Sequence, residues 1–208
     1  MKITDDVYML DSAVRSHVFL IKSQENILID TALPGISKEI MRELKDLGAE
    51  NIQHILLTHH DVDHIGNAEL LQKQTGAILW ASDEDIPFIT GEKKRPGVKR
   101  MIQSIVRLKI PIVNGYPSDD FNGIKIIRAP GHTPGHVILL YHDVLFTGDL
   151  FKIINGEFKP MPSYMNWNQQ EAAKSVALLK DLNFEWLCPS HGQPLRRNAV
   201  YERFISQY

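Results

Sequence analysis

Three histidines and two aspartates fall within the six residues from His59 to His64, in the stretch LLTHHDVDHIGN. The stretch begins in an apolar run, which predicts that a strand ends where these side chains start. A chain that turns at a strand end lets alternate side chains converge, whereas within a strand they project from opposite faces. Imidazole nitrogens and carboxylate oxygens are common ligands of divalent metals in proteins. The candidate ligands here are His59, Asp61, Asp63 and His64.

Three more candidate ligands occupy the same kind of position, each after another apolar run. They are His132 in RAPGHTPGH, Asp149 in LFTGDLF and His191 in CPSHGQP. One tetrahedral zinc ion takes only four ligands, so a set of this size suits two adjacent cations that share a carboxylate and a water. Two cations would also neutralise the aspartates, which would otherwise repel each other and partly protonate.

Strands and helices alternate along the chain and must position these loops. Apolar and β-branched runs predict strands, and apolar residues at helical spacing predict helices. We expect strands at 7–10, 17–22, 26–31, 52–59, 78–82, 124–130, 136–141, 144–148 and 184–189, and helices at 34–48, 66–76, 98–110, 168–182 and 198–207. Strands grouped with helices around them predict the α/β class, with two packed sheets and helices outside.

We expect the whole chain, residues 1–208, to form one domain. The segment from about 83 to 120 departs from the pattern, because it is charged and is broken by Pro87, Gly91, Pro96 and Gly97. It is predicted to be an insertion that serves as a lid or as a partner surface, and it is our candidate for a homodimer contact.

The composition excludes few classes of protein. The chain has 43% hydrophobic and 23% charged residues and a formal net charge of −2, a balance that calls for neither nucleic acid nor an anionic membrane. No apolar run reaches the roughly 20 residues that span a bilayer, and MKITDDVYML lacks the features of a secretory signal. The single cysteine, Cys188, favours a reducing compartment, so we expect a cytoplasmic protein. The expected partner is a small-molecule substrate.

THHDVDHIGN, GHTPGH, TGD and SHG, in this order, resemble the signature of the metallo-β-lactamase superfamily. IDTALPG resembles an early loop of the same family, so the resemblance covers nearly the whole chain. It implies an αββα four-layer sandwich with the site along one sheet edge. By this resemblance the ligands of the first metal would be His59, Asp61 and His132, those of the second would be Asp63, His64 and His191, and Asp149 would bridge the two.

Asp61 departs from that signature, which has a histidine at this position. A carboxylate is a harder ligand than imidazole and shifts the preference toward iron or manganese, although zinc accepts it. We therefore expect two divalent ions, with zinc as the first choice and iron or manganese as the second. The alternative is that Asp61 faces solvent beside a site for one metal.

The resemblance implies a metal-dependent hydrolase in which a metal-activated hydroxide attacks an ester, lactone or thioester. Asp63 would bind a metal and orient the hydroxide. His136 and Thr58 are candidates for orienting the ligands, whereas His60 is expected to pack or hydrogen-bond away from them.

Three residues are candidates for substrate binding. Lys152 could hold a substrate carboxylate, and Tyr164 and Trp167 could line a pocket. The alternatives are a solvated lysine and a loop that packs its aromatic residues on the core.

Two other activities stay open at this point. One is an iron-dependent oxidoreductase, because persulfide dioxygenases of the family bind a single iron through positions matching His59, His132 and Asp149. The other is a phosphodiesterase or nuclease, supported only by the basic segment 93–100, and such a run of charges is usually a solvated surface.

Overall fold

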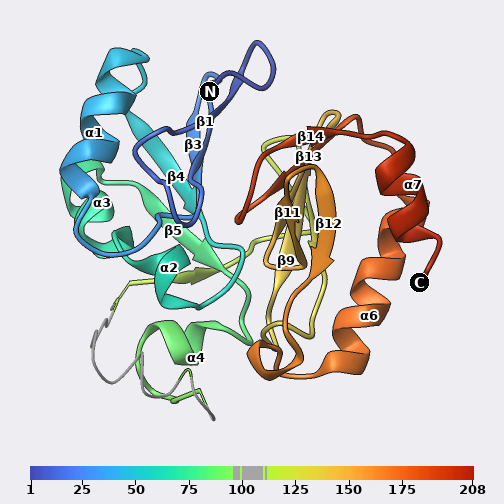
Figure 1. The fold of residues 1–208 in the computed structure, drawn as a ribbon. Coiled ribbons are helices and arrows are strands. Elements are labelled where there is room, and N and C mark those ends of the chain that lie inside the picture. Colours follow the sequence, from blue (N-terminus) through green and yellow to red (C-terminus); the bar gives the residue numbers. More distant parts are fainter. Residues whose placement is uncertain (96–98, 100–109, 111) are drawn as a thin grey trace. The chain divides into compact units, whose positions relative to one another are not determined.

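The computed structural model describes residues 1–95, 99, 110 and 112–208, and it divides into two compact units, Met1–Gly115 and Tyr116–Tyr208. Each unit contains one six-stranded sheet, and the elements are labelled in Figure 1. The combination of sheets and helices confirms the predicted α/β class. The expectation of one domain over residues 1–208 stays a prediction.

The sheet of the first unit has the strand order β1-β2-β3-β4-β5-β6. Its strands are β1 (Val7–Met9), β2 (Phe19–Ile21), β3 (Asn26–Ile29), β4 (Ile52–Leu56), β5 (Ile78–Ala81) and β6 (Asn114–Gly115). Strands β1 to β3 pair antiparallel, and β3 to β6 pair parallel. Parallel neighbours need a crossover, which helices supply. The helices are α1 (Ser37–Asp46) between β3 and β4, α2 (Val62–Ile65) and α3 (Ala68–Thr75) between β4 and β5, and α4 (Ile86–Ile89) after β5.

Helix α1 shows how the core of this unit is built. Ile40 and Leu44 lie one turn apart, and both are fully buried in the cluster that also contains Leu28 of β3. The helix is followed by Gly48, whose φ of 62° suits the end of a helix, as predicted. The prediction that it begins at Pro34 is wrong: Gly35 has a φ of 101°, which a right-handed helix excludes, so α1 starts only at Ser37.

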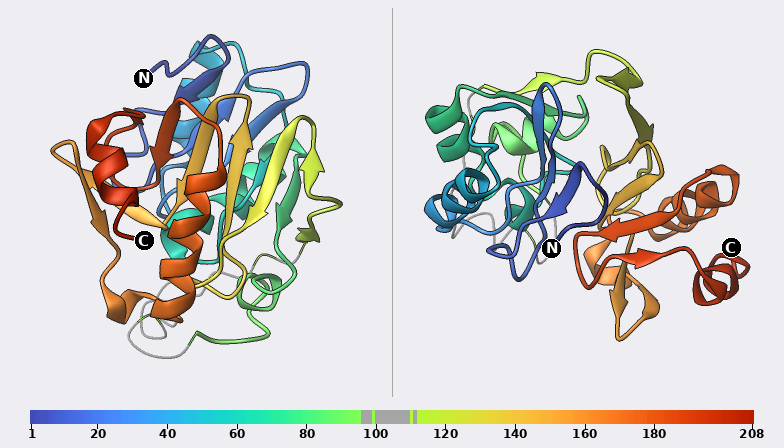
Figure 2. Two further views of the ribbon diagram at one scale, coloured as in Figure 1. Left: turned by 90° about the vertical axis from the view of Figure 1, so that its right-hand side faces the viewer. Right: turned by 90° about the horizontal axis from the view of Figure 1, so that it is seen from above.

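The sheet of the second unit has the strand order β14-β13-β10-β9-β8-β7. Its strands are β7 (Asp120–Phe121), β8 (Ile124–Arg128), β9 (Val137–Tyr141), β10 (Val144–Gly148), β13 (Trp186–Pro189) and β14 (Leu195–Arg196). Strands β10 and β13 pair parallel across the connection that contains α6 (Gln169–Ala177) and the 3-10 turn η2 (Leu178–Asp181). Helix α7 (Ala199–Ile205) ends the unit, and Figure 2 shows α6 and α7 on the same side of its strands.

The second unit also contains a hairpin that was not predicted. Strands β11 (Phe151–Ile154) and β12 (Glu157–Pro160) form a separate two-stranded sheet, followed by the 3-10 turn η1 (Ser163–Met165). Phe151 and Phe158 are buried in the cluster that packs against α7. The hairpin therefore belongs to the core of this unit.

The predicted insertion at about 83–120 contains α4, β6 and the start of β7. The helix predicted at 98–110 lies outside the described residues except for Lys99 and Ile110. Within the described part of the chain, every helix is too short or too polar to cross a bilayer.

Candidate metal centre

In the first unit the candidate ligands lie where β4 gives way to α2. Strand β4 lies between β3 and β5, so its end is enclosed, and His59 and His64 are at most 1% exposed. The backbone N–H groups of His64 and Ile65 both donate to the carbonyl of Asp61, at 2.9 and 3.1 Å. This single helical turn folds the chain back, so residues 59 and 64 meet instead of diverging.

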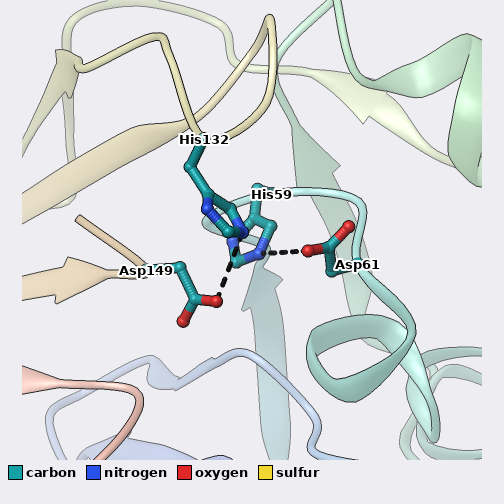
Figure 3. A group of neighbouring side chains, drawn as sticks. All are labelled: His59, Asp61, His132 and Asp149. Atoms are coloured by element: carbon teal, nitrogen blue, oxygen red, sulfur yellow. Dashed lines mark ion pairs between the residues drawn. The ribbon is translucent and has the colours of Figure 1, made fainter. Parts of the chain in front are cut away.

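The donor atoms of this turn are close together. The Nε2 atom of His59 lies 3.5 Å from Oδ2 of Asp61, a pair drawn in Figure 3. The ring centroids of His59 and His64 are 3.8 Å apart, and Nε2 of His64 lies 3.8 Å from Oδ2 of Asp63. Imidazole and carboxylate atoms at these distances fit a divalent cation as ligands.

The carboxylate of Asp30 holds this turn through contacts with Thr58 and His64. One carboxylate oxygen accepts from the N–H of Thr58 at 2.8 Å, and the other accepts from the Thr58 hydroxyl at 2.7 Å and lies 2.8 Å from Nδ1 of His64. Holding one imidazole nitrogen by a carboxylate fixes the ring and leaves Nε2 for a metal. The orienting role of Thr58 stays a prediction, and these contacts make Asp30 a further candidate for it.

Asp61 has two cationic partners that the sequence did not identify. Nη1 of Arg95 lies 2.5 Å from Oδ1 of Asp61, and the Lys99 ammonium contacts Oδ2. The side chains of Arg95, Lys99 and Asp61 are only 4%, 8% and 9% exposed. The interpretation of segment 93–100 as a solvated charged surface is therefore wrong for these two residues, which turn inward to a buried carboxylate.

His60 points away from the ligands, as predicted. Its Nδ1 atom lies 2.9 Å from a carboxylate oxygen of Asp85, and its ring stacks on Phe88 at a centroid distance of 4.5 Å. The ring is fully buried, so this histidine supports the loop from within the core.

In the second unit the three candidate ligands meet at one edge of the sheet. Strands β10 and β13 are parallel, and β8 runs the same way because each of its two steps to β10 is antiparallel. The carboxyl ends of these strands therefore share an edge, which carries His132, Asp149 and His191. One oxygen of Asp149 lies 3.3 Å from Nε2 of His132 (Figure 3), and the other lies 3.2 Å from Nε2 of His191.

Two neighbours position these ligands. Nε2 of His136 accepts a hydrogen bond from the backbone N–H of Asp149 at 3.0 Å, and the orienting role of His136 stays a prediction. Nδ1 of His132 lies 2.9 Å from the side-chain oxygen of Asn166. The sequence did not identify Asn166, although it lies between the two aromatic residues that were noted.

The substrate candidates also lie in the second unit. The backbone N–H of Trp167 donates to the carbonyl of His132 at 3.1 Å, so this loop is attached to the His132 turn. Tyr164 and Trp167 are 72% and 44% exposed, which argues against a loop that packs both rings on the core. Lys152 lies on β11 and is half-buried.

Comparison with known proteins identifies the family. The profile of the metallo-beta-lactamase superfamily matches residues 12–191, a range that includes all seven candidate ligands. YobT of Bacillus subtilis is 31% identical over 200 residues, which cover 86% of this chain and 83% of YobT. The probable metallo-hydrolase YybB of the same organism is 25% identical, with 92% and 88% covered. The chain therefore belongs to the metallo-β-lactamase superfamily.

A named hydrolase and two solved structures complete the comparison. Hydroxyacylglutathione hydrolase GloC of Haemophilus influenzae is 28% identical over 130 residues, which cover 56% of this chain and 57% of GloC. A superfamily protein of Sulfolobus tokodaii, ST1585, has a TM-score of 0.73 at 18% identity, with 98% and 86% covered. TTHA1623, solved in a di-iron-bound form, has a TM-score of 0.68 at 21% identity, with 88% and 90% covered. The chain thus has the metallo-β-lactamase fold and is an enzyme of the metallo-hydrolase class that binds divalent metal.

Proposed function

We propose that this enzyme binds two divalent metal ions and hydrolyses a small ester, lactone or thioester. The ligands of the first ion would be His59, Asp61 and His132, those of the second would be Asp63, His64 and His191, and Asp149 would bridge. The observation that carries the proposal is the position of Asp149, whose two oxygens each face a different histidine, at 3.3 and 3.2 Å. A carboxylate placed in this way can serve one cation with each oxygen.

Zinc is our first choice for both ions, with iron or manganese second. The nitrogen and oxygen donor set suits all three, and Asp61 shifts the preference toward the harder ions. Support for iron comes from TTHA1623, a neighbour in fold that was solved with two irons.

The metals, when bound, supply a water of lowered pKa and a Lewis acid that polarises the substrate carbonyl. Asp63 is suited to handle the proton, because its side chain is 30% exposed whereas His59 and His64 are at most 1% exposed. Its carboxylate would accept a hydrogen bond from the attacking water and take that proton as the water oxygen bonds to the carbonyl carbon. It would then give the proton to the leaving group as the bond from that group to the carbonyl carbon breaks. Asp30 and His136 would take no part in the proton transfer. They would hold the metal ligands in place before the substrate binds.

Among the three substrate classes, we favour a thioester, because GloC and other relatives are named hydroxyacylglutathione hydrolases. A thioester of glutathione carries two carboxylates, both at the ends of the glutathione part and away from the scissile bond. Tyr164 and Trp167 would cover the substrate, and Lys152 would pair with a carboxylate. A cytoplasmic location, a homodimer contact through 83–120 and independence of nucleic acid stay predictions.

The experiment is a metal analysis paired with a substrate screen. Protein purified without added metal, under anaerobic conditions, is analysed for zinc, iron and manganese and then tested on esters, lactones, thioesters and phosphodiesters. We expect hydrolysis that a chelator abolishes and that Asp63→Ala and His132→Ala lower by orders of magnitude with the fold intact. The matched control is Asp46→Ala, at an exposed position on α1.

Three results would contradict this proposal. Full activity of either ligand variant on a verified substrate would refute the assigned site. A single iron with oxygen uptake on glutathione persulfide would favour the oxidoreductase, and cleavage of phosphodiesters alone would favour the nuclease.

A further inference from the structure

We propose that Arg95 and Lys99 compete with the metal ion for Asp61. The position offered by His59 and Asp61 would then bind its ion more weakly than the position offered by Asp63 and His64, and would fill second. This inference rests on the proposed two-metal function, and it assigns a role to cations that the family signature does not include.

The contacts show that Asp61 is held on both sides. Arg95 reaches one oxygen at 2.5 Å, and Lys99 reaches the other. All three side chains are less than a tenth exposed. Water screens such a buried cluster only weakly, so its charges act on a nearby ion at close to full strength.

An ion that binds Asp61 must approach a carboxylate that two cations already hold. The guanidinium of Arg95 contacts one of its oxygens and the ammonium of Lys99 contacts the other. A divalent ion at Asp61 must share its ligand with these cations or displace them. Sharing adds repulsion, and displacement breaks buried ion pairs, which is costly.

Asp63 lies in a different environment. Its side chain is 30% exposed, and one of its oxygens lies 3.8 Å from the imidazole of His64, which Asp30 holds from its other nitrogen. Solvent and the Asp30 carboxylate both favour a cation here. The two positions therefore differ in electrostatics although both contain one aspartate and one histidine.

Aspartate at position 61, where the family signature has a histidine, fits this competition between cations and metal. A neutral imidazole could not balance two buried cations, whereas a carboxylate accepts from both with its two oxygens. Because linkage is reciprocal, an ion bound at Asp61 would weaken the hold on Arg95 and Lys99 by the same factor. Metal occupancy would thus be coupled to the segment that carries these residues.

The test is a titration of metal-free protein with Co²⁺. Binding is measured by calorimetry and by the visible absorption of the bound ion. Arg95→Gln and Lys99→Gln remove one charge each but keep a hydrogen-bond donor for Asp61. Lys99→Arg keeps the charge, and Lys94→Gln is the matched control at an exposed position of the same segment. Thermal unfolding of each metal-free variant checks the fold, and Lys99→Gln tests the inference alone if Arg95→Gln does not fold.

We expect two binding phases in the natural protein. Each glutamine variant should tighten the weaker phase by about tenfold or more, because a unit charge a few ångströms from an ion shifts binding by at least that much inside a protein. The stronger phase should change much less, and Lys99→Arg and Lys94→Gln should match the natural protein. One ion bound by the natural protein and two by the glutamine variants would support the same conclusion.

If the affinity of the weaker phase is unchanged or lower in both glutamine variants, the inference is overturned. Arg95 and Lys99 would then orient Asp61 as a metal ligand and would not compete with the metal. That outcome leaves the proposed function intact, because two ions still bind. Absence of metal binding in every variant would instead refute the proposed function, and this inference with it.

Discussion

Replacing Asp30 by asparagine changes the one carboxylate that holds both Thr58 and His64. Asparagine tolerates the left-handed backbone that residue 30 adopts, at a φ of 58°, so the substitution adds little strain. It keeps one acceptor oxygen for the N–H of Thr58, and its amide can donate to the Thr58 hydroxyl. It loses the contact of 2.8 Å with Nδ1 of His64 and the negative charge behind all three interactions.

The size of the effect follows from these contacts. Hydrogen bonds to a charged group contribute about 1.5–3 kcal/mol each, and one is lost outright while two are weakened. We expect Asp30→Asn to lower the free energy of unfolding of the metal-free protein by about 2–3 kcal/mol. Because His64 loses its orienting partner, metal affinity should fall by about 10- to 100-fold.

Urea unfolding and metal titration measure the two effects separately. The matched control is Asp5→Asn, which makes the same chemical change in an exposed pair with Lys2 and should change the free energy of unfolding far less, because water screens exposed ion pairs. An Asp30→Asn variant as stable as the control, with unchanged metal affinity, would refute the supporting role assigned to Asp30.

Three further predictions concern the folded chain. Gly66→Ala should lower the free energy of unfolding by about 3 kcal/mol, because an added Cβ would lie 2.4 Å from the backbone oxygen of Ala32; a loss under about 1 kcal/mol by urea unfolding would contradict this. Burial raises the pKa of Tyr201 from 10.0 to about 12. The neutral hydroxyl of Tyr201 therefore contributes fully to the free energy of unfolding below pH 10, and this contribution is lost as the pH rises toward 12. Tyr201→Phe should remove that alkaline decline. Near neutral pH it should lower the free energy of unfolding by about 1 kcal/mol, because the hydrogen bond from the Tyr201 hydroxyl to the carbonyl of Leu179 is lost. A pH profile of unfolding that Tyr201→Phe leaves unchanged would show that Tyr201 does not cause the decline. Burial also raises the pKa of the Cys188 thiol, so a disulfide reagent should modify it only on unfolding, and rapid reaction of the native protein would contradict this.

The strand ends and their polar residues could be predicted because both signals are local. An apolar run that stops at a histidine or aspartate marks a loop, and the parallel course of β10 and β13 then places Asp149 beside His191. The hairpin of β11 and β12 also had a local signal that was not used: Asn155 and Gly156 form a dipeptide typical of two-residue hairpin turns, with Ile154 before it and Phe158 shortly after it, and both adopt positive φ.

Other features could not be read locally. Asp61 forms ion pairs with Arg95 and Lys99, which lie 34 and 38 positions further along the chain. A run of basic residues gives no sign of which of its cations turn inward. Asn166 is likewise 34 positions from His132, and an amide in a loop is too common to signal a contact. Such partners are decided by tertiary packing, which composition and periodicity do not encode.

We propose above all that seven side chains bind two ions that share Asp149. Anomalous diffraction from crystals of the metal-loaded protein, recorded at the absorption edge of the metal, tests it directly. We expect two peaks, one contacted by His59 and His132 and the other by His64 and His191, with one oxygen of Asp149 on each. A single peak, or peaks away from these residues, would contradict it.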